Sequence, residues 1–145
     1  MARLKIAGIG AGYFSRFHLE GWRTVPYAEV VAWCDTETPK AAALAAEFGV
    51  PRTFSDPATM LDACTPDLVD IVTPPPSHAA LVALAHARGI AAISQKPMEA
   101  LLRASRELRL RFVSVEHDAA AGGMRFIRGP LHGQVRQVRV HLVRE

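Results

Sequence analysis

The chain has 145 residues, half of them apolar, and its 17 Lys and Arg against 14 Asp and Glu give a formal net charge of +3. This length suits one domain with a buried core, and the ordinary charge content excludes an intrinsically disordered chain. No apolar run is long enough to cross a membrane or act as a signal peptide, and two cysteines without C-x-x-C spacing indicate reduced thiols in a cytoplasmic protein.

The first predicted unit leads from one buried strand to the next. The apolar run Leu4–Ile9 predicts a strand, which Gly10 and Gly12 follow at once. Apolar and aromatic residues then recur at helical spacing, and a second apolar run, residues 30–34, ends on Asp35. Strand, glycine turn, helix, strand and acid within about 30 residues form the context of a dinucleotide-binding turn.

Each residue of that turn has a physical reason. Gly10 allows a tight turn after the strand, because a residue without Cβ tolerates unusual backbone angles. Gly12 lets the main chain approach a pyrophosphate, which would sit at the positive N-terminus of the following helix. Asp35 stands where an acid accepts hydrogen bonds from the adenosine ribose and repels a 2′-phosphate, so NAD is favoured over NADP. Ser15 replaces the third glycine of the motif, and a turn that merely closes a tight loop is the alternative.

Further along the chain, helical and extended segments alternate. A helix opened by Thr38 as N-cap ends at Gly49, and Asp56 caps a second, short helix that runs through Leu61. A third helix is predicted over residues 77–88. Short strands are predicted at residues 52–54, 67–72 and 90–94, and an apolar stretch follows at residues 110–115.

This alternation predicts an α/β fold, a Rossmann-like, doubly wound and mainly parallel sheet of about six strands with helices on both faces. Leu4–Ile9 is expected at its centre, with residues 67–72 parallel to it and next to it. Ligands of such sheets bind outside the carboxyl ends of the strands. Three chemically distinctive segments fall at such ends, at residues 10–15, 73–78 and 95–97.

Four sequence features taken together resemble one family of oxidoreductases. They are the glycine turn with Phe17-His18, residues 30–35, residues 69–75 with Ser77-His78, and Gln95-Lys96-Pro97. Over residues 3–98 the chain is similar to the nucleotide-binding domain of the glucose–fructose oxidoreductase, inositol dehydrogenase and MocA (Gfo/Idh/MocA) family. The resemblance implies NAD(P) binding here, and oxidation or reduction of a sugar or cyclitol carbon that a second, mostly antiparallel α/β domain holds.

The resemblance also implies roles for individual residues. Lys96 matches the lysine of the family's Glu-Lys-Pro motif, with Gln95 in place of the glutamate, and is the expected catalytic residue. A lysine beside the nicotinamide can take the proton of the reacting hydroxyl or stabilise the growing alkoxide. A surface lysine at a strand end is the alternative, and no metal site is expected. The expected cofactor-binding residues are Gly10, Gly12, Tyr13, Phe14, Asp35, Thr73, Pro74, His78 and Lys96.

The chain is expected to divide into a nucleotide-binding domain, residues 1–117, and a linker with the first strand of a truncated substrate domain, residues 118–145. The Asp and His that the family's second domain supplies have no counterparts, so the chain is expected to bind NAD but to turn over little. Alternating apolar residues over 137–142 predict an exposed strand through which copies of the chain form a homo-oligomer. A sugar or polyol is the expected substrate, with neither nucleic acid nor membrane as a partner.

Two other functions stay open at this stage. One is a dinucleotide-binding module without catalysis, in which Lys96 has no chemical role. The other is a surface for nucleic acid or an acidic partner, because residues 101–145 carry 9 basic and 4 acidic side chains, with Arg103, Arg106 and Arg109 on one helix face. Without an interleaved aromatic platform, a solvated helix face explains these arginines better.

Overall fold

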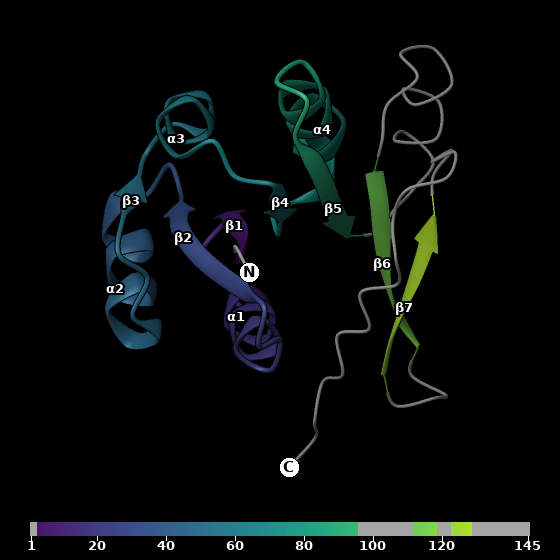
Figure 1. The fold of residues 1–145 in the computed structure, drawn as a ribbon, viewed down its shortest axis with the longest axis horizontal. Coiled ribbons are helices and arrows are strands. Elements are labelled where there is room, and N and C mark those ends of the chain that lie inside the picture. The colour runs from purple at the N-terminus through teal and green to yellow at the C-terminus, as the bar shows by residue number, and fades with distance from the viewer. Residues whose placement is uncertain (1–2, 96–111, 119–122, 129–145) are drawn as a thin grey trace.

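The computed structural model of the chain describes residues 3–95, 112–118 and 123–128 (Figure 1). The strands of these segments form one sheet in the order β3-β2-β1-β4-β5-β6-β7. Neighbouring strands are parallel except for β6 and β7, which are antiparallel. The strands are β1 Leu4–Ile9, β2 Ala28–Cys34, β3 Thr53–Phe54, β4 Leu68–Ile71, β5 Ala91–Gln95, β6 Phe112–Asp118 and β7 Gly123–Arg128.

Strand β1 lies where the strand order reverses. Ile6 of β1 pairs with Val30 of β2 on one side and with Leu68 of β4 on the other. The predicted position of β1 and the parallel pairing of β4 beside it are therefore confirmed, as is the Rossmann-like α/β fold. In such a sheet the crevice at the carboxyl ends of the strands on either side of the reversal is where a ligand binds.

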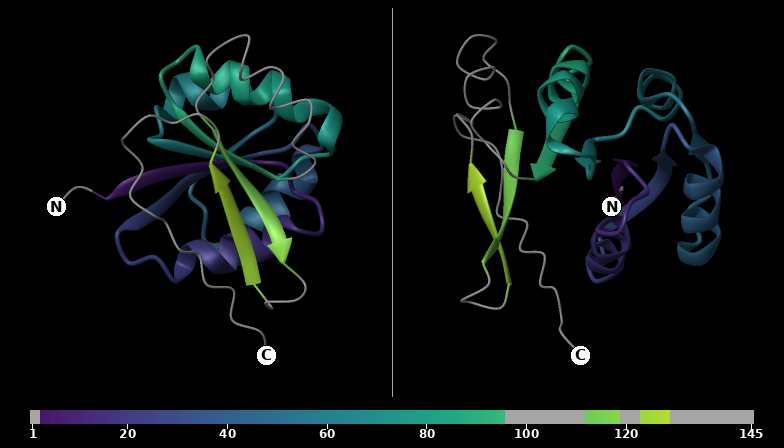
Figure 2. Two further views of the ribbon diagram at one scale, coloured as in Figure 1. Left: turned by 90° about the vertical axis from the view of Figure 1, so that its right-hand side faces the viewer. Right: turned by 180° about the vertical axis from the view of Figure 1, so that it is seen from behind.

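Among the described residues, four α-helices cover the two faces of the sheet (Figure 2). Helices α1 (Ser15–Arg23) and α2 (Thr38–Phe48) pack on the face that Trp33 and Val72 share. Helices α3 (Pro57–Cys64) and α4 (His78–His86) pack on the opposite face, and a short 3-10 turn, η1 (Pro75–Ser77), precedes α4. Because side chains alternate along a strand, each buried strand contributes to both cores.

Three helix ends were predicted from single residues, and two of these predictions are confirmed. Gly49 ends α2 in a left-handed conformation with φ of 70°, and the Asp56 carboxylate accepts a 2.8 Å hydrogen bond from the Thr59 N–H at the start of α3. The prediction that Thr38 caps α2 is wrong, because Glu37 occupies the N-cap position and Thr38 is already helical. Asp35 Oδ1 accepts a hydrogen bond from the Glu37 N–H at 2.7 Å, and this turn starts the helix one residue earlier than predicted.

The sheet continues past residue 117, the predicted end of the nucleotide-binding domain. Strand β7, which was not predicted, pairs with β6 from Val113↔Arg128 to Asp118↔Gly123. Whether residues 118–145 belong to a second domain stays a prediction. The strand expected over residues 137–142, and the association of copies expected through it, lie outside the described residues.

Candidate functional site

The glycine turn after β1 fits closely against the neighbouring strands. Gly10 has a φ of 104°, and a Cβ at this position would lie 2.7 Å from the carbonyl carbon of Val72 and closer still to its oxygen. The Gly10 N–H donates to the Cys34 carbonyl at 2.8 Å, at the end of β2. Only glycine satisfies both the backbone angle and the close approach, so the predicted requirement for glycine here has a structural basis.

The side chain of Trp33 is hydrogen-bonded to the same turn. Its indole is fully buried, and Nε1 donates to the Gly10 carbonyl at 2.8 Å. Gly8 is the register partner of Trp33 on β1, and a Cβ on Gly8 would overlap the indole ring. This contact is not predicted from the sequence, although a glycine inside a strand often marks a site where another group approaches the backbone closely.

Beyond Gly10 the turn is open. Nothing described lies within 4 Å of where a Cβ on Gly12 would be. In the described part of the chain, the main-chain N–H groups of Gly12, Tyr13 and Phe14 have no hydrogen-bond acceptor, just before the first residue of α1. Tyr13 is 76% exposed and Phe14 is 54% exposed, with their ring centroids 5.3 Å apart. Unpaired N–H groups at a helix N-terminus favour an anion, so this surface suits a phosphate group.

Asp35 lies at the carboxyl end of β2 and faces the turn. Its Oδ2 accepts a 2.7 Å hydrogen bond from the Ala11 N–H, while Oδ1 accepts the Glu37 N–H at 2.7 Å. A carboxylate offers about four lone-pair positions, so two remain for the hydroxyl groups of a ligand. The structure thus places Asp35 beside Gly10 and Gly12 with its carboxylate already oriented.

The segment after β4 forms the other side of the crevice. A Cβ on Gly10 would lie 3.1 Å from Thr73 Cγ2, so this segment lies directly against the glycine turn. Thr73 Oγ1 lies 2.5 Å from Ser77 Oγ, and the Ser77 hydroxyl donates to the Pro74 carbonyl at 2.8 Å. His78 is only 1% exposed, and its Nε2 lies 2.6 Å from the Thr73 carbonyl oxygen.

Lys96, the expected catalytic residue, lies outside the described residues. The strand that leads to it is described, because β5 ends at Gln95, beside β4 and with its carboxyl end at the same edge of the sheet. The prediction that residue 96 follows a strand at this edge is consistent with that order. The structure therefore brings eight of the nine predicted site residues to one edge of the sheet.

A buried polar cluster under α1 was not predicted as a unit. Asp70 of β4 is 1% exposed and accepts hydrogen bonds from His18 Nδ1 and Trp22 Nε1, each at 2.8 Å to Oδ2. Burial alone would lower the pKa of His18, but the charge of Asp70 and its hydrogen bond outweigh burial and raise that pKa. The cluster ties α1 to β4 and so fixes the helix whose N-terminus borders the crevice.

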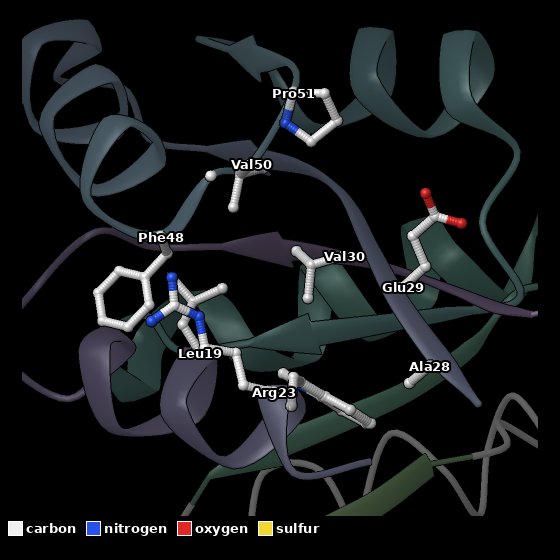
Figure 3. Close-up of a pocket in the computed structure, with 10 residues that line it drawn as sticks. Leu19, Arg23, Ala28, Glu29, Val30, Phe48, Val50 and Pro51 are labelled. Atoms are coloured by element: carbon white, nitrogen blue, oxygen red, sulfur yellow. The ribbon is translucent and has the colours of Figure 1, made fainter. Parts of the chain in front are cut away.

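An open groove of about 400 Å³ lies elsewhere, toward the amino end of β2 (Figure 3). The end of α1, the start of β2 and the end of α2 form it, and the Arg23 guanidinium stacks 4.8 Å from the centre of the Phe48 ring. None of the predicted site residues lines it. The residues described include no group of three His, Cys, Asp or Glu that could hold a metal ion. No helix among them is long and apolar enough to span a membrane.

Comparison with known proteins identifies close relatives of this arrangement. Residues 4–116 match the oxidoreductase family with an NAD-binding Rossmann fold, Gfo/Idh/MocA. A D-apiose dehydrogenase of Paraburkholderia graminis is 46% identical over 106 residues, which are 73% of this chain and 28% of that protein.

Solved structures agree with this match. An oxidoreductase from Agrobacterium radiobacter, solved with NAD+, L-tartaric acid and magnesium, is 31% identical, with a TM-score of 0.70 over 78% of this chain and 35% of that one. The myo-inositol 2-dehydrogenase of Lactobacillus plantarum is similar in fold, with a TM-score of 0.70 at 22% identity over 77% of this chain and 36% of that one. The chain spans about a third of the length of these relatives or less.

Proposed function

Because the chain belongs to the Gfo/Idh/MocA oxidoreductase family and forms its NAD-binding Rossmann domain, we propose that it is the nucleotide-binding part of an NAD-dependent sugar or polyol dehydrogenase. The nicotinamide would exchange a hydride with a carbon that bears a hydroxyl group. The chain's own residues would bind and orient the dinucleotide along the crevice at the carboxyl edge of the sheet. The observation that supports this best is the open glycine turn, where N–H groups without an acceptor among the described residues lie near the oriented Asp35 carboxylate.

The pyrophosphate position follows from the turn. Gly12 leaves space for close approach, and the main-chain N–H groups of Tyr13 and Phe14 are free, in the described part of the chain, to donate to phosphate oxygens. The exposed rings of Tyr13 and Phe14 offer apolar contact area beside it. On the opposite wall, Thr73 and Pro74 would border the nicotinamide half.

Asp35 carries the proposed preference for NAD over NADP. Its two remaining acceptor positions suit the 2′- and 3′-hydroxyls of the adenosine ribose, and its negative charge opposes a 2′-phosphate. The hydrogen bonds to the Ala11 and Glu37 N–H groups hold the carboxylate in place before the ligand arrives, which lowers the entropy lost on binding.

Lys96 is the proposed catalytic residue, through the family resemblance of Gln95-Lys96-Pro97. It would accept the proton of the substrate hydroxyl, or stabilise the negative charge that develops on that oxygen during hydride transfer. The substrate would be a sugar or polyol, held by a domain beyond the described residues. A dinucleotide-binding module without catalysis is the second candidate, since every supporting contact described above concerns the nucleotide.

Calorimetric titration of the 145-residue chain with NAD and NADP tests the proposal. We expect NAD to bind more tightly, and Asp35→Ala to weaken NAD by about tenfold or more while narrowing the gap to NADP, because hydrogen bonds to a charged acceptor are lost. Asp56→Ala is the control, since it removes another carboxylate that accepts from a main-chain N–H, that of Thr59 at the start of α3. Equal affinity for both cofactors in the unmutated chain would refute the preference.

Hydride transfer separates the two candidates. The absorbance of reduced nicotinamide, followed with D-apiose, myo-inositol and related polyols, should show little turnover by this chain alone and clear turnover by a protein that also carries a substrate domain. Lys96→Met in that longer protein should abolish turnover and leave NAD affinity nearly unchanged. Full activity of the Lys96→Met variant would contradict the catalytic role.

A further inference from the structure

We propose that His78 is a positioning residue, which fixes the main chain at Thr73 and so sets the shape of the crevice without touching the cofactor. This inference rests on the proposed function and assigns His78 a different role from the direct contact that the family resemblance implies. The observations behind it are its burial, its hydrogen bond to Thr73 and the composition of the loop that it supports.

His78 is enclosed by protein. It is 1% exposed and is the first residue of α4. Its Nε2 lies 2.6 Å from the Thr73 carbonyl oxygen, and because a carbonyl can only accept, Nε2 carries the hydrogen. In the described part of the chain, Nδ1 is the one buried side-chain polar atom without a hydrogen-bond partner. Within the described residues, the imidazole therefore makes a single hydrogen bond, and its acceptor is the Thr73 carbonyl of the loop.

The loop needs such a donor because of its sequence. Pro74, Pro75 and Pro76 have no N–H, so three successive residues cannot donate to a main-chain carbonyl. The Pro74 carbonyl accepts both the N–H, at 3.2 Å, and the hydroxyl, at 2.8 Å, of Ser77, whereas the Thr73 carbonyl accepts from the imidazole of His78. The prolines stiffen the loop, and the His78 side chain supplies the donor that holds its first carbonyl, that of Thr73.

The position of Thr73 matters because of what lies against it. A Cβ on Gly10 would meet Thr73 Cγ2 at 3.1 Å and the Val72 carbonyl closer still, so the loop and the glycine turn are in direct contact. A shift of the Thr73 carbonyl toward a new donor would therefore change the width of the crevice at the turn. His78 would therefore affect the affinity for the cofactor indirectly, through the contact between the loop and the glycine turn.

Two amide variants separate the hydrogen bond from the packing. A glutamine side chain places its amide nitrogen as many bonds from Cβ as Nε2 of histidine, whereas an asparagine nitrogen corresponds to Nδ1 and falls short of Thr73. We expect His78→Gln to keep NAD affinity within about threefold and His78→Asn to weaken it by about tenfold, as for a buried acceptor left without its donor. Val82→Ala, which truncates a fully buried side chain on the same helix, should lower thermal stability and leave NAD affinity unchanged.

The measurements are calorimetric titration with NAD, thermal unfolding of each variant, and ¹H–¹⁵N spectra that report which ring nitrogen of His78 carries the hydrogen. Equal affinities of the Gln and Asn variants, or a loss of affinity in Val82→Ala as large as in His78→Asn, would overturn the positioning role. A His78 tautomer with the hydrogen on Nδ1 would overturn it independently of any ligand. If the unmutated chain fails to bind NAD, the proposed function fails, and the tautomer still decides whether His78 holds Thr73.

Discussion

Replacing Gly10 or Gly12 by alanine should separate the folding of the glycine turn from its binding. At Gly10 the backbone φ is 104°, and an added Cβ would lie 2.7 Å from the Val72 carbonyl carbon. A non-glycine residue in such a region costs about 1–3 kcal/mol, and overpacking against fixed atoms adds about 1–3 kcal/mol. We therefore expect Gly10→Ala to lower the free energy of unfolding by roughly 2–6 kcal/mol.

Gly12→Ala should behave in the opposite way. Nothing described lies within 4 Å of its added Cβ, and Gly12 is not among the described glycines with positive φ. The free energy of unfolding should change by no more than about 0.5 kcal/mol, as at an ordinary surface position. NAD affinity should fall sharply, because the methyl group occupies the space through which the pyrophosphate approaches the main chain.

Urea unfolding followed by far-ultraviolet circular dichroism, with calorimetric titration of NAD, measures both quantities. Gly49→Ala is the control for backbone strain without a clash, since Gly49 has a φ of 70° and none of the described residues lies within 4 Å of an added Cβ. Its free energy of unfolding should fall by about 1 kcal/mol, and its affinity for NAD should stay unchanged. If Gly10→Ala has the same free energy of unfolding as Gly49→Ala, the predicted clash with Val72 is absent. If Gly12→Ala binds NAD as tightly as the unmutated chain, the predicted role of Gly12 is wrong.

Three further predictions concern buried groups. Since the pKa of His18 is raised in the folded chain, the stability that protonated His18 gains from Asp70 is complete below the unfolded pKa of about 6.5 and is lost as pH rises through the folded pKa. Asp70→Asn should reduce this pH dependence of the urea unfolding midpoint, and an unchanged pH dependence would contradict the coupling. Burial, with the charges of Asp56 and Asp35, raises the pKa of the Cys34 thiol to about 11, so a thiol reagent at pH 8 should modify Cys64 first and Cys34 only on unfolding. Equal rates of modification at the two cysteines would contradict this. Trp33→Phe should lower the free energy of unfolding by about 1–3 kcal/mol, because the Gly10 carbonyl loses its buried donor. An unchanged urea midpoint would argue against a contribution of the Trp33–Gly10 hydrogen bond to stability.

Local sequence patterns were sufficient for the elements that position the site. Leu4–Ile9 was predicted with the bounds that β1 has, and the ends of α2 at Gly49 and α3 at Asp56 follow from the conformations and hydrogen bonds that single residues favour. Parallel pairing of β1 with β4 follows from the alternation of strands and helices, because a crossover connection returns the chain in the same direction. For the same reason, the segments after these strands could be assigned to one edge of the sheet in advance.

Contacts between residues far apart in the sequence were decided by the tertiary structure. The Trp33 indole beneath Gly10 and the Asp70 carboxylate between His18 and Trp22 depend on strand register and on which face of the sheet each side chain occupies. Asp70 in sequence is only an acid within an apolar strand, and nothing local states that α1 supplies its partners 48 and 52 residues away. Periodicity determines which residues are buried, whereas the pairing of buried polar groups is settled only when the elements pack, because an unpaired one costs more than its hydrogen bond gains.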